Sequence, residues 1–327
     1  MIRRVVSVCI ALLMLVACAG QPAATARRAI IVGMPYIPNV QFAHFYLAAE
    51  KGFFKDEGLD VTFDYNFEND VVQRIATKNK IEFALASADS ILLARAQGLP
   101  VKAVMSTSQE FPVAFMSKST LTLATPADLK GKVIGIPGRF GASYIGLQAL
   151  LHAGGLTEAD VTIQEIGFNQ VPALLSDKVQ IISGYANNEP IQLAAQGTAV
   201  NVLRVADFYP MASDQLIVNE SLISGEKDVI TKFTRALQKG MQAVSDDPAA
   251  AYTISLKYIP EAKPADQAVT TDVLKATVAM WKANTTTLGL IQPAQWAKTH
   301  ELLRSVGALK QDLDVTTAYD ASFVVAK

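Results

Sequence analysis

The stretch Gly135-Ile136-Pro137-Gly138-Arg139-Phe140-Gly141-Ala142-Ser143-Tyr144 places three glycines and one proline between an apolar run and a helical pattern. The preceding Lys132-Val133-Ile134 predicts a short buried strand, and the sequence from Ile145 onward predicts an amphipathic helix. Glycines let a chain turn sharply and approach a ligand closely. Ser143 falls near the predicted helix start, where free N–H groups favour a ligand rich in acceptors. The stretch is therefore either a ligand-binding loop or an ordinary strand-to-helix turn.

Short apolar segments alternate with amphipathic patterns on both sides of this stretch, which is typical of parallel-type α/β sheets. The pattern predicts strands over residues 30–33, 59–63, 83–86, 101–105, 113–116, 161–166, 181–184, 200–205 and 215–218. It predicts helices over residues 42–49, 71–78, 89–96, 229–241, 272–282 and 294–306. A chain of 327 residues that is 50% hydrophobic is long enough for two lobes with separate cores.

A second loop, Gly184-Tyr185-Ala186-Asn187-Asn188-Glu189-Pro190, also follows a predicted strand and precedes a helix. Open α/β sheets bind ligands beyond the carboxyl ends of their strands. We therefore expect both loops to face the loops around Tyr36 and Ser87 of the first lobe, across a ligand site.

The amino terminus has the layout of a secretory signal peptide, predicted over residues 1–17. Arg3 and Arg4 precede a run of twelve residues that is apolar except for Ser7, which is too short to span a bilayer. Leu15-Val16-Ala17-Cys18 resembles a bacterial lipobox, which implies lipidation of Cys18 and attachment to the outer face of the cell membrane. Residues 18–28 would form the tether. The alternative is a plain secreted protein with an incidental cysteine.

Composition excludes several other classes of protein. The chain has two cysteines, Cys9 and Cys18, so the mature domain has no disulfide, thiol nucleophile or thiolate metal site. Its three histidines, His44, His152 and His300, are too scattered to predict a metal site. The net charge is −1 with both signs dispersed, which argues against a nucleic-acid partner.

Several short segments occur in a fixed order: Asn39 with the aromatic-rich helix after it, Glu50-Lys51-Gly52-Phe53-Phe54, Glu57-Gly58-Leu59-Asp60-Val61, Ala86-Ser87-Ala88-Asp89, Gln97-Gly98-Leu99-Pro100-Val101 and Leu129-Lys130-Gly131-Lys132. Together they resemble the thiamine-pyrimidine, sulfonate and nitrate group of solute-binding proteins of ABC importers. The resemblance implies a two-lobe periplasmic-binding-protein-like fold of type II with a helical C-terminal part. It also implies a hinge with crossovers near Ser117 and Asp214, a monomer, and an ABC permease as partner. The lobes would be residues 29–117 with 215–327, and residues 118–214.

The predicted ligand site combines flat aromatic surfaces with directional polar groups. Its candidates are Tyr36, Asn39, Phe42, Ser87, Asp89, Arg139, Phe140, Gly141, Ser143, Tyr144, Tyr185, Asn187, Asn188, Glu189 and Trp281. Some have a structural alternative. Phe42 and Trp281 share helices with core residues, Asp89 is placed to cap a helix, and Arg139 is placed to meet water. Glu68 is interpreted as part of a solvated helix start.

Within the family, the two loops look closest to those of a riboflavin-binding member, so riboflavin is the expected transported ligand. A flavin needs rings for stacking and polar partners for its ribityl chain. A thiamine-precursor pyrimidine is the alternative, because it would use a smaller version of the same site. Nitrate and sulfonate need compact anion sites, for which these aromatics are a poor fit. Related fungal pyrimidine synthases carry a cysteine-rich iron motif that this chain lacks, so we expect a binding protein without activity, cofactor or metal.

Overall fold

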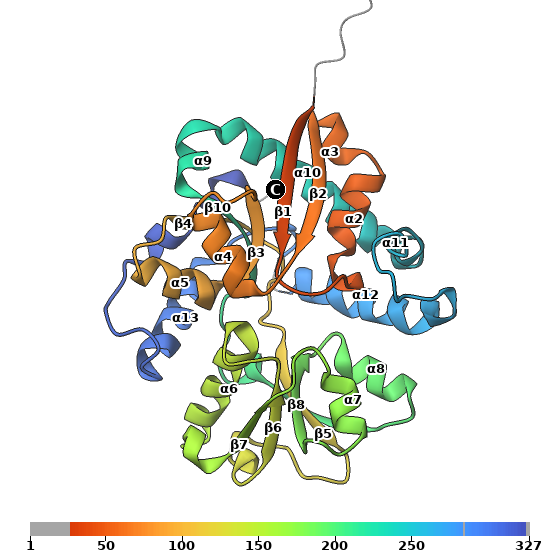
Figure 1. Cartoon of the computed structure of the whole chain (residues 1–327), viewed down its shortest axis with the longest axis vertical. Coiled ribbons are helices and arrows are strands. Elements are labelled where there is room, and N and C mark those ends of the chain that lie inside the picture. The colour runs from red at the N-terminus through yellow and green to blue at the C-terminus, as the bar shows by residue number, and fades with distance from the viewer. Residues whose placement is uncertain (1–26, 284, 325–327) are drawn as a thin grey trace, which may run out of the picture.

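The computed structural model describes residues 27–283 and 285–324, which form two lobes stacked along the long axis (Figure 1). The predicted signal peptide and Cys18 lie outside the described residues. None of the helices in the described ranges combines the length and the apolar character needed to cross a membrane.

The first lobe is built on a five-stranded sheet in which one strand runs against its neighbours. The order is β2 (Leu59–Tyr65), β1 (Arg28–Met34), β3 (Phe83–Ser87), β10 (Asp214–Asn219) and β4 (Val101–Ser106). β1 pairs in parallel with β2 and β3, whereas β10 pairs antiparallel with β3 and β4. β10 corresponds to the strand that the sequence predicts over residues 215–218.

The second lobe repeats this arrangement with its own strands. Their order is β7 (Thr162–Glu165), β6 (Val133–Ile136), β8 (Ile181–Tyr185), β5 (Val113–Lys118) and β9 (Val200–Arg204). Here β5 is the antiparallel strand. The predicted two-lobe α/β fold is therefore confirmed, with one strand in each sheet that enters from the other lobe.

The first boundary between the lobes lies earlier in the chain than the sequence predicts, because β5 belongs to the second sheet. We expected a crossover near Ser117, which would leave residues 113–117 in the first lobe. The structure pairs this segment with β8 and β9, because an apolar run with two buried faces fits the interior of a sheet. The two connections between the sheets are residues 107–112 and 205–213.

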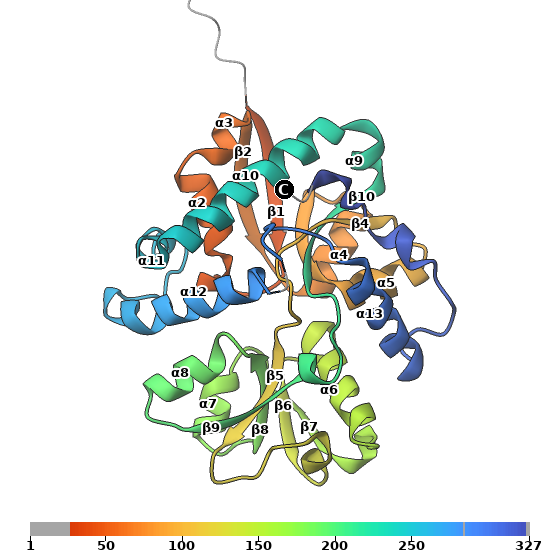
Figure 2. The same ribbon diagram turned by 180° about the vertical axis from the view of Figure 1, so that it is seen from behind.

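Helices cover both faces of each sheet (Figures 1 and 2). In the first lobe, one face carries α4 (Glu68–Ala76), α5 (Ala88–Ala96) and α13 (Pro293–Ser305). The other carries α2 (Ala43–Glu50), α10 (Lys227–Asp246), α11 (Pro248–Ser255) and α12 (Gln267–Trp281), with α3 (Phe53–Asp56) and α9 (Glu220–Gly225) nearby. In the second lobe, α6 (Gly141–Ala153) covers one face, and α7 (Gln170–Leu175) and α8 (Glu189–Ala195) cover the other.

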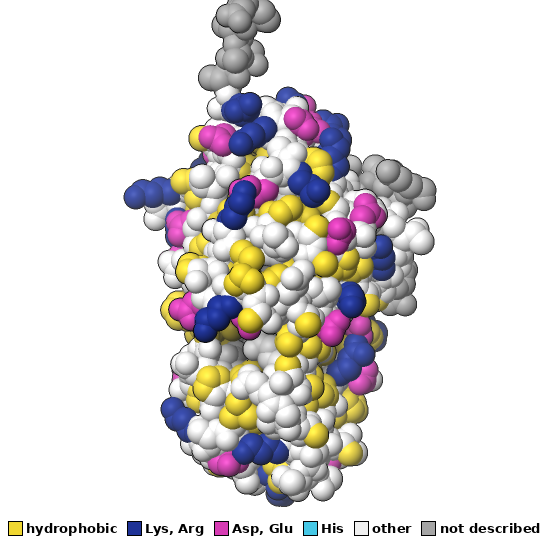
Figure 3. Space-filling view, turned by 90° about the vertical axis from the view of Figure 1, so that its right-hand side faces the viewer, with side chains coloured by type: hydrophobic (Ala, Val, Ile, Leu, Met, Phe, Trp, Pro, Cys, Tyr) yellow, Lys and Arg dark blue, Asp and Glu magenta, His cyan; other side chains and the backbone are white. Residues whose placement is uncertain are grey.

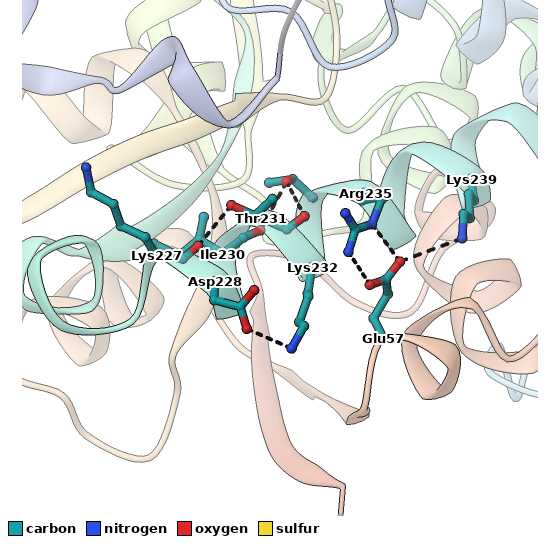
Figure 4. Close-up of polar contacts among 9 residues, drawn as sticks. Glu57, Lys227, Asp228, Ile230, Thr231, Lys232, Arg235 and Lys239 are labelled. Carbon is teal, nitrogen blue, oxygen red and sulfur yellow. Dashed lines mark hydrogen bonds and ion pairs between the residues drawn. The ribbon is translucent and has the colours of Figure 1, made fainter.

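The long helix α10 joins the C-terminal part to the first sheet. Its apolar face is buried, and Phe233 stacks on Phe83 with ring centroids 4.0 Å apart. On the outer face, Glu57 at the end of α3 accepts a hydrogen bond from Nε of Arg235 at 2.7 Å and lies 3.7 Å from Lys239 (Figure 4). Apolar packing thus fixes one face of α10 to the first lobe, and ion pairs with Glu57 link its outer face to the end of α3.

The C-terminal part also holds both connections between the lobes. The amide of Gln109 donates to the carbonyl of Met280 at 3.0 Å, and its side chain donates to the carbonyl of Leu290 at 2.8 Å. In the second connection, the amide of Ala212 donates to the hydroxyl of Thr299 at 3.0 Å. The surface beside α11 and α12 mixes charges of both signs with small apolar areas (Figure 3).

Candidate functional site

A cavity lies between the lobes, at the carboxyl ends of β1, β3, β6 and β8. It holds about 1110 Å³ of space, its open mouth included. Both lobes contribute to its wall: Pro35, Tyr36, Gln41, Phe42, His44, Glu68, Leu85, Ser87, Thr107, Ser108, Pro112, Pro137, Phe140, Gly141, Ala142, Ser143, Phe168, Gln170, Gly184, Tyr185, Asn187, Glu189, Asp214, Thr277, Met280 and Trp281.

Ten of the predicted site residues line this cavity, and aromatic rings make up a large part of them. They are Tyr36, Phe42, Ser87, Phe140, Gly141, Ser143, Tyr185, Asn187, Glu189 and Trp281. Trp281 is buried and packs edge-on against His44 at 4.9 Å, so it belongs both to the core and to the wall.

Aromatic rings also meet across the cleft between the lobes. Tyr36 of the first lobe lies edge-on to Phe168 of the second, with centroids 4.3 Å apart. The half-exposed Phe67 lies 5.5 Å from Phe140 and 5.4 Å from Phe168. These contacts bring the lobes together at one side of the cavity.

The second loop turns its polar side chains inward. Glu189, the first residue of α8, folds back and accepts a hydrogen bond from the amide of Tyr185 at 2.6 Å. Gly184 makes room for it, since a Cβ there would lie 2.7 Å from the carboxyl group. Asn187 donates to Thr277 at 2.8 Å and accepts from Gln41 at 3.2 Å, so it bridges the lobes.

The first loop contributes Phe140, Pro137 and small residues to the cavity wall. Gly135 belongs to β6, where a Cβ would lie 2.7 Å from the side chain of Ile166. Gly141 begins α6 with φ of +63°, and a Cβ there would lie 2.6 Å from a carboxyl oxygen of Glu68. The glycine at 141 therefore lets the first lobe approach the amino terminus of α6.

The structure places Glu68 in the wall, and its interpretation as a solvated helix start is wrong. Its Oε1 accepts hydrogen bonds from the amide of Ser87 at 2.7 Å and from its hydroxyl at 2.5 Å. Glu68 begins α4 but its side chain reaches the first turn of α5, where free N–H groups attract an anion.

Five predicted site residues do not line the cavity. Asn39 caps the 3₁₀ turn Val40–Phe42 by accepting from the amide of Gln41 at 2.9 Å. Arg139 pairs with Glu158 on the outer side of α6. The hydroxyl of Tyr144 donates to the same Glu158 at 2.6 Å. The side chains of Arg139 and Tyr144 point away from the cavity because Glu158 offers an acceptor on that side.

The other two predicted site residues that do not line the cavity, Asn188 and Asp89, are buried behind its wall. Asn188 is buried and donates to Glu189 at 3.1 Å, so it supports a lining residue. Asp89 is fully buried in the first turn of α5. Burial first, and then the charge of Glu68, raises the pKa of Asp89 to about 8.

The sequence analysis missed several lining residues, of which His44, Asp214, Phe168 and Gln170 are the most informative. His44 sits within an apolar helical pattern and Asp214 at the start of a buried strand, and neither carries a local signal. Phe168 and Gln170 follow β7, so the strand-end rule that selected the other loops also points to them.

Acidic groups set the electrostatics of the cavity. Burial first, and then the charge of Glu68, raises the pKa of Asp214 to about 7. Burial also raises the pKa of Glu189. The pKa of Tyr185 is raised by burial and by the surrounding carboxylates, with Asp214 contributing most among them. Within the described part of the chain, no group of three or more His, Cys, Asp or Glu side chains is placed to hold a metal ion.

The match to a family model identifies the class of protein. Residues 39–251 match the model described as NMT1/THI5 like. The chain belongs to the NMT1/THI5-like family. Its relatives include the riboflavin-binding protein RibY of Chloroflexus aurantiacus, which is 46% identical over 90% of this chain and 86% of its own. A formylaminopyrimidine-binding protein of Halalkalibacterium halodurans is 26% identical over 77% of this chain and 78% of its own.

Solved structures of ABC-type solute-binding proteins share the fold of this NMT1/THI5-like protein. The alkanesulfonate-binding protein SsuA of Xanthomonas axonopodis pv. citri, bound to MOPS, superposes with a TM-score of 0.71. The match covers 91% of this chain and 99% of SsuA at 15% sequence identity. This likeness establishes the two-lobe architecture. The identity of the ligand has to be inferred from the residues that line the cavity.

Proposed function

We propose that the protein captures riboflavin outside the cytoplasm and delivers it to the permease of an ABC importer. The observation that carries this proposal is the 46% identity to a riboflavin-binding relative over most of both chains. The cavity between the lobes gives the proposal a physical basis.

A flavin ring is large and flat, and it gains most from aromatic side chains on both faces. Aromatic contacts contribute about 0.5–1.5 kcal/mol each beyond the burial of area. The wall offers six such rings, drawn from both lobes: Tyr36, Phe42, Phe140, Phe168, Tyr185 and Trp281. A ligand held between rings of both lobes would also hold the lobes together.

The polar groups of the wall suit the rest of the vitamin. The ribityl chain carries hydroxyl groups, and the ring edge carries two carbonyls and one N–H. Carboxylates accept hydrogen bonds, hydroxyls do both, and amides supply donors as well as acceptors. Glu68, Asp214 and Glu189 supply acceptors, while Ser87 and Gln170 supply further partners.

A thiamine-precursor pyrimidine is the second candidate ligand, because a relative 26% identical to this chain is a formylaminopyrimidine-binding protein. A pyrimidine has a single small ring and would contact fewer of the aromatic side chains that both lobes contribute to the wall. We also propose that the protein catalyses no reaction, since its binding-protein relative covers nearly the whole chain.

We further propose that the mature protein is a monomer anchored by a lipid on Cys18. Replacing Cys18 by Ser should release the protein from the membrane fraction of the native host. Retention of Cys18→Ser in that fraction would contradict the anchor without touching the ligand assignment.

Titration of riboflavin with the mature domain tests the ligand directly. Stacking on electron-rich rings quenches flavin fluorescence, so we expect saturable quenching with a stoichiometry of one. A thiamine pyrimidine serves as the control ligand and should neither compete nor raise the melting temperature. If the pyrimidine protects the protein from heat and riboflavin does not, the second candidate replaces the first.

A further inference from the structure

The charged residues in the cavity wall are all acidic. Glu68 comes from α4, Asp214 from β10 and Glu189 from α8, so carboxylates enter from three elements and from both lobes. None of the described lining residues is a lysine or arginine. Arg139, the arginine nearest to the wall in the sequence, is occupied outside by Glu158 and Glu165.

These carboxylates share one cavity and act on one another electrostatically. The charge of Glu68 raises the pKa of Asp214, and Tyr185 experiences the charges of Asp214, Glu68 and Glu189 together. The space between them is lined by both lobes and open at its mouth, so water screens these charges less than it does in bulk solvent.

A second, independent feature of the wall also favours an uncharged ligand. His44 is 3% exposed, and its ring lies in the wall of the cavity. The backbone of Gln41 approaches the ring, but neither ring nitrogen completes a hydrogen bond among the described residues. Burial lowers the pKa of His44 to about 3, so the ring is neutral and adds no positive charge to the wall.

From these features we propose that the cavity selects its ligand by charge: it accepts the uncharged flavin and rejects the 5′-phosphate ester of the same flavin. The inference rests on the proposed function, since it specifies the form of riboflavin that is bound. Carboxylates accept hydrogen bonds from the ribityl hydroxyls and from the ring N–H.

A phosphate group on the ribityl chain would be repelled by these carboxylates instead of donating hydrogen bonds to them. Near pH 7 it carries between one and two negative charges and presents mainly acceptors. In this cavity its charge would lie near Glu68 and, above their raised pKa values, near the carboxylates of Asp214 and Glu189, with no described cation in the wall to compensate for it. Burying an unpaired charge is strongly unfavourable.

Three flavins of matched ring structure test the inference on the unmodified mature domain: riboflavin, riboflavin 5′-phosphate and an uncharged 5′-acetyl ester. We expect the phosphate to bind at least about 30-fold more weakly than riboflavin, as for one like charge in a partly screened interior. The acetyl ester should stay within about 5-fold of riboflavin, because it adds bulk without charge.

The second part of the experiment measures the same ligands on a variant that lacks two carboxylates of the wall. In Glu68→Gln/Asp214→Asn, the ratio of phosphate to riboflavin affinity should rise about 10-fold. Glu261→Gln removes the same kind of charge from an exposed position and should leave the ratio unchanged. The comparison of the three ligands needs no variant, so it decides the question even if the double variant does not fold.

The outcomes separate this inference from the proposed function. Equal binding of riboflavin and its phosphate overturns the charge selection alone, as does an acetyl ester rejected as strongly as the phosphate. An unchanged ratio in a folded double variant also overturns it. Binding of neither flavin overturns the proposed function, and this inference with it.

Discussion

The two loops at the strand ends of the second lobe follow the same local pattern but meet the cavity in different ways. The loop before α6 turns Arg139 and Tyr144 outward to Glu158 and lines the cavity with Phe140 and small groups. The loop before α8 turns Tyr185, Asn187 and Glu189 inward.

Their glycines show why the two loops differ. Gly141 makes room for a residue of the other lobe, the carboxyl group of Glu68, whereas Gly184 makes room for Glu189 of its own loop. The first loop therefore approaches the other lobe, whereas the second brings its own carboxylate into the cavity wall. A glycine at a strand end indicates that another group lies close to the backbone there. Which group that is, from the other lobe or from the same loop, cannot be told from the glycine itself.

The largest expected effect separates two tyrosines, one from each loop. Tyr185→Ala removes a ring from the wall and should weaken riboflavin binding about 100-fold, from lost stacking and lost apolar burial. Tyr144→Ala removes the same side chain from the outer side of α6 and should change the affinity less than about 3-fold. Fluorescence quenching titrations measure both.

A reversed order of the two tyrosines would contradict the proposed division between the loops. Circular dichroism of both variants is the control, because Tyr144 donates a hydrogen bond to Glu158 and its loss affects the fold rather than the ligand.

The acidic groups behind and within the wall predict a pH dependence. Asp89 and Asp214 have pKa values of about 8 and about 7 in the folded chain, well above the ordinary aspartate pKa of 3.8. The folded state therefore binds more protons than the unfolded state between about pH 4 and pH 8, so stability falls as pH rises through this range. We expect the melting temperature to drop by on the order of 5 °C between pH 5.5 and pH 8.5.

Asp89→Asn tests the origin of this slope. The amide is uncharged at every pH and removes the titration of Asp89, so the decline should become shallower. A slope that is unchanged in Asp89→Asn would show that other groups produce it.

A matched pair of glycines isolates the contact between the lobes. Gly141 and Gly155 both have φ of +63°, but a Cβ at Gly155 meets no atom within 4 Å. Either change to alanine should cost about 1–2 kcal/mol of stability from backbone strain. Gly141→Ala should in addition push Glu68 away and weaken riboflavin binding about 5-fold, through lobes that close less fully.

Solution scattering measures this closure. The unmodified domain and Gly155→Ala should become more compact when riboflavin is added, and Gly141→Ala should do so less. Equal compaction and equal affinity in both variants would mean that Glu68 and Gly141 do not meet in the ligand-bound state.

Local patterns in the sequence predict this fold well. The alternation of apolar and amphipathic segments predicts all ten strands in their order, because burial against helices on two faces leaves a distinct pattern. The first crossover was misplaced, since Val113–Lys118 looks like any other buried strand and only its pairing shows which lobe holds it.

The site was harder to predict than the fold. Its loops were found because ligands bind at strand ends, but the direction of a side chain depends on partners far away in the sequence. Arg139 points outward because of Glu158, and Glu68 points inward because of Ser87. Local patterns contain neither partner. His44 and Asp214 carry no local signal at all, as they belong to buried segments.

The smallest expected effect concerns Arg139, the one cation among the candidates. Its side chain is 45% exposed and pairs with Glu158 and Glu165, so its loss should cost less than about 1 kcal/mol of stability, and less still at high salt. Riboflavin affinity in Arg139→Ala should stay within about 2-fold of the unmodified domain, because the side chain lies outside the wall. Thermal melts at two ionic strengths and a quenching titration measure the two quantities. A loss of affinity of 10-fold or more would place Arg139 at the ligand, and would make the two loops alike in function as they are in sequence pattern.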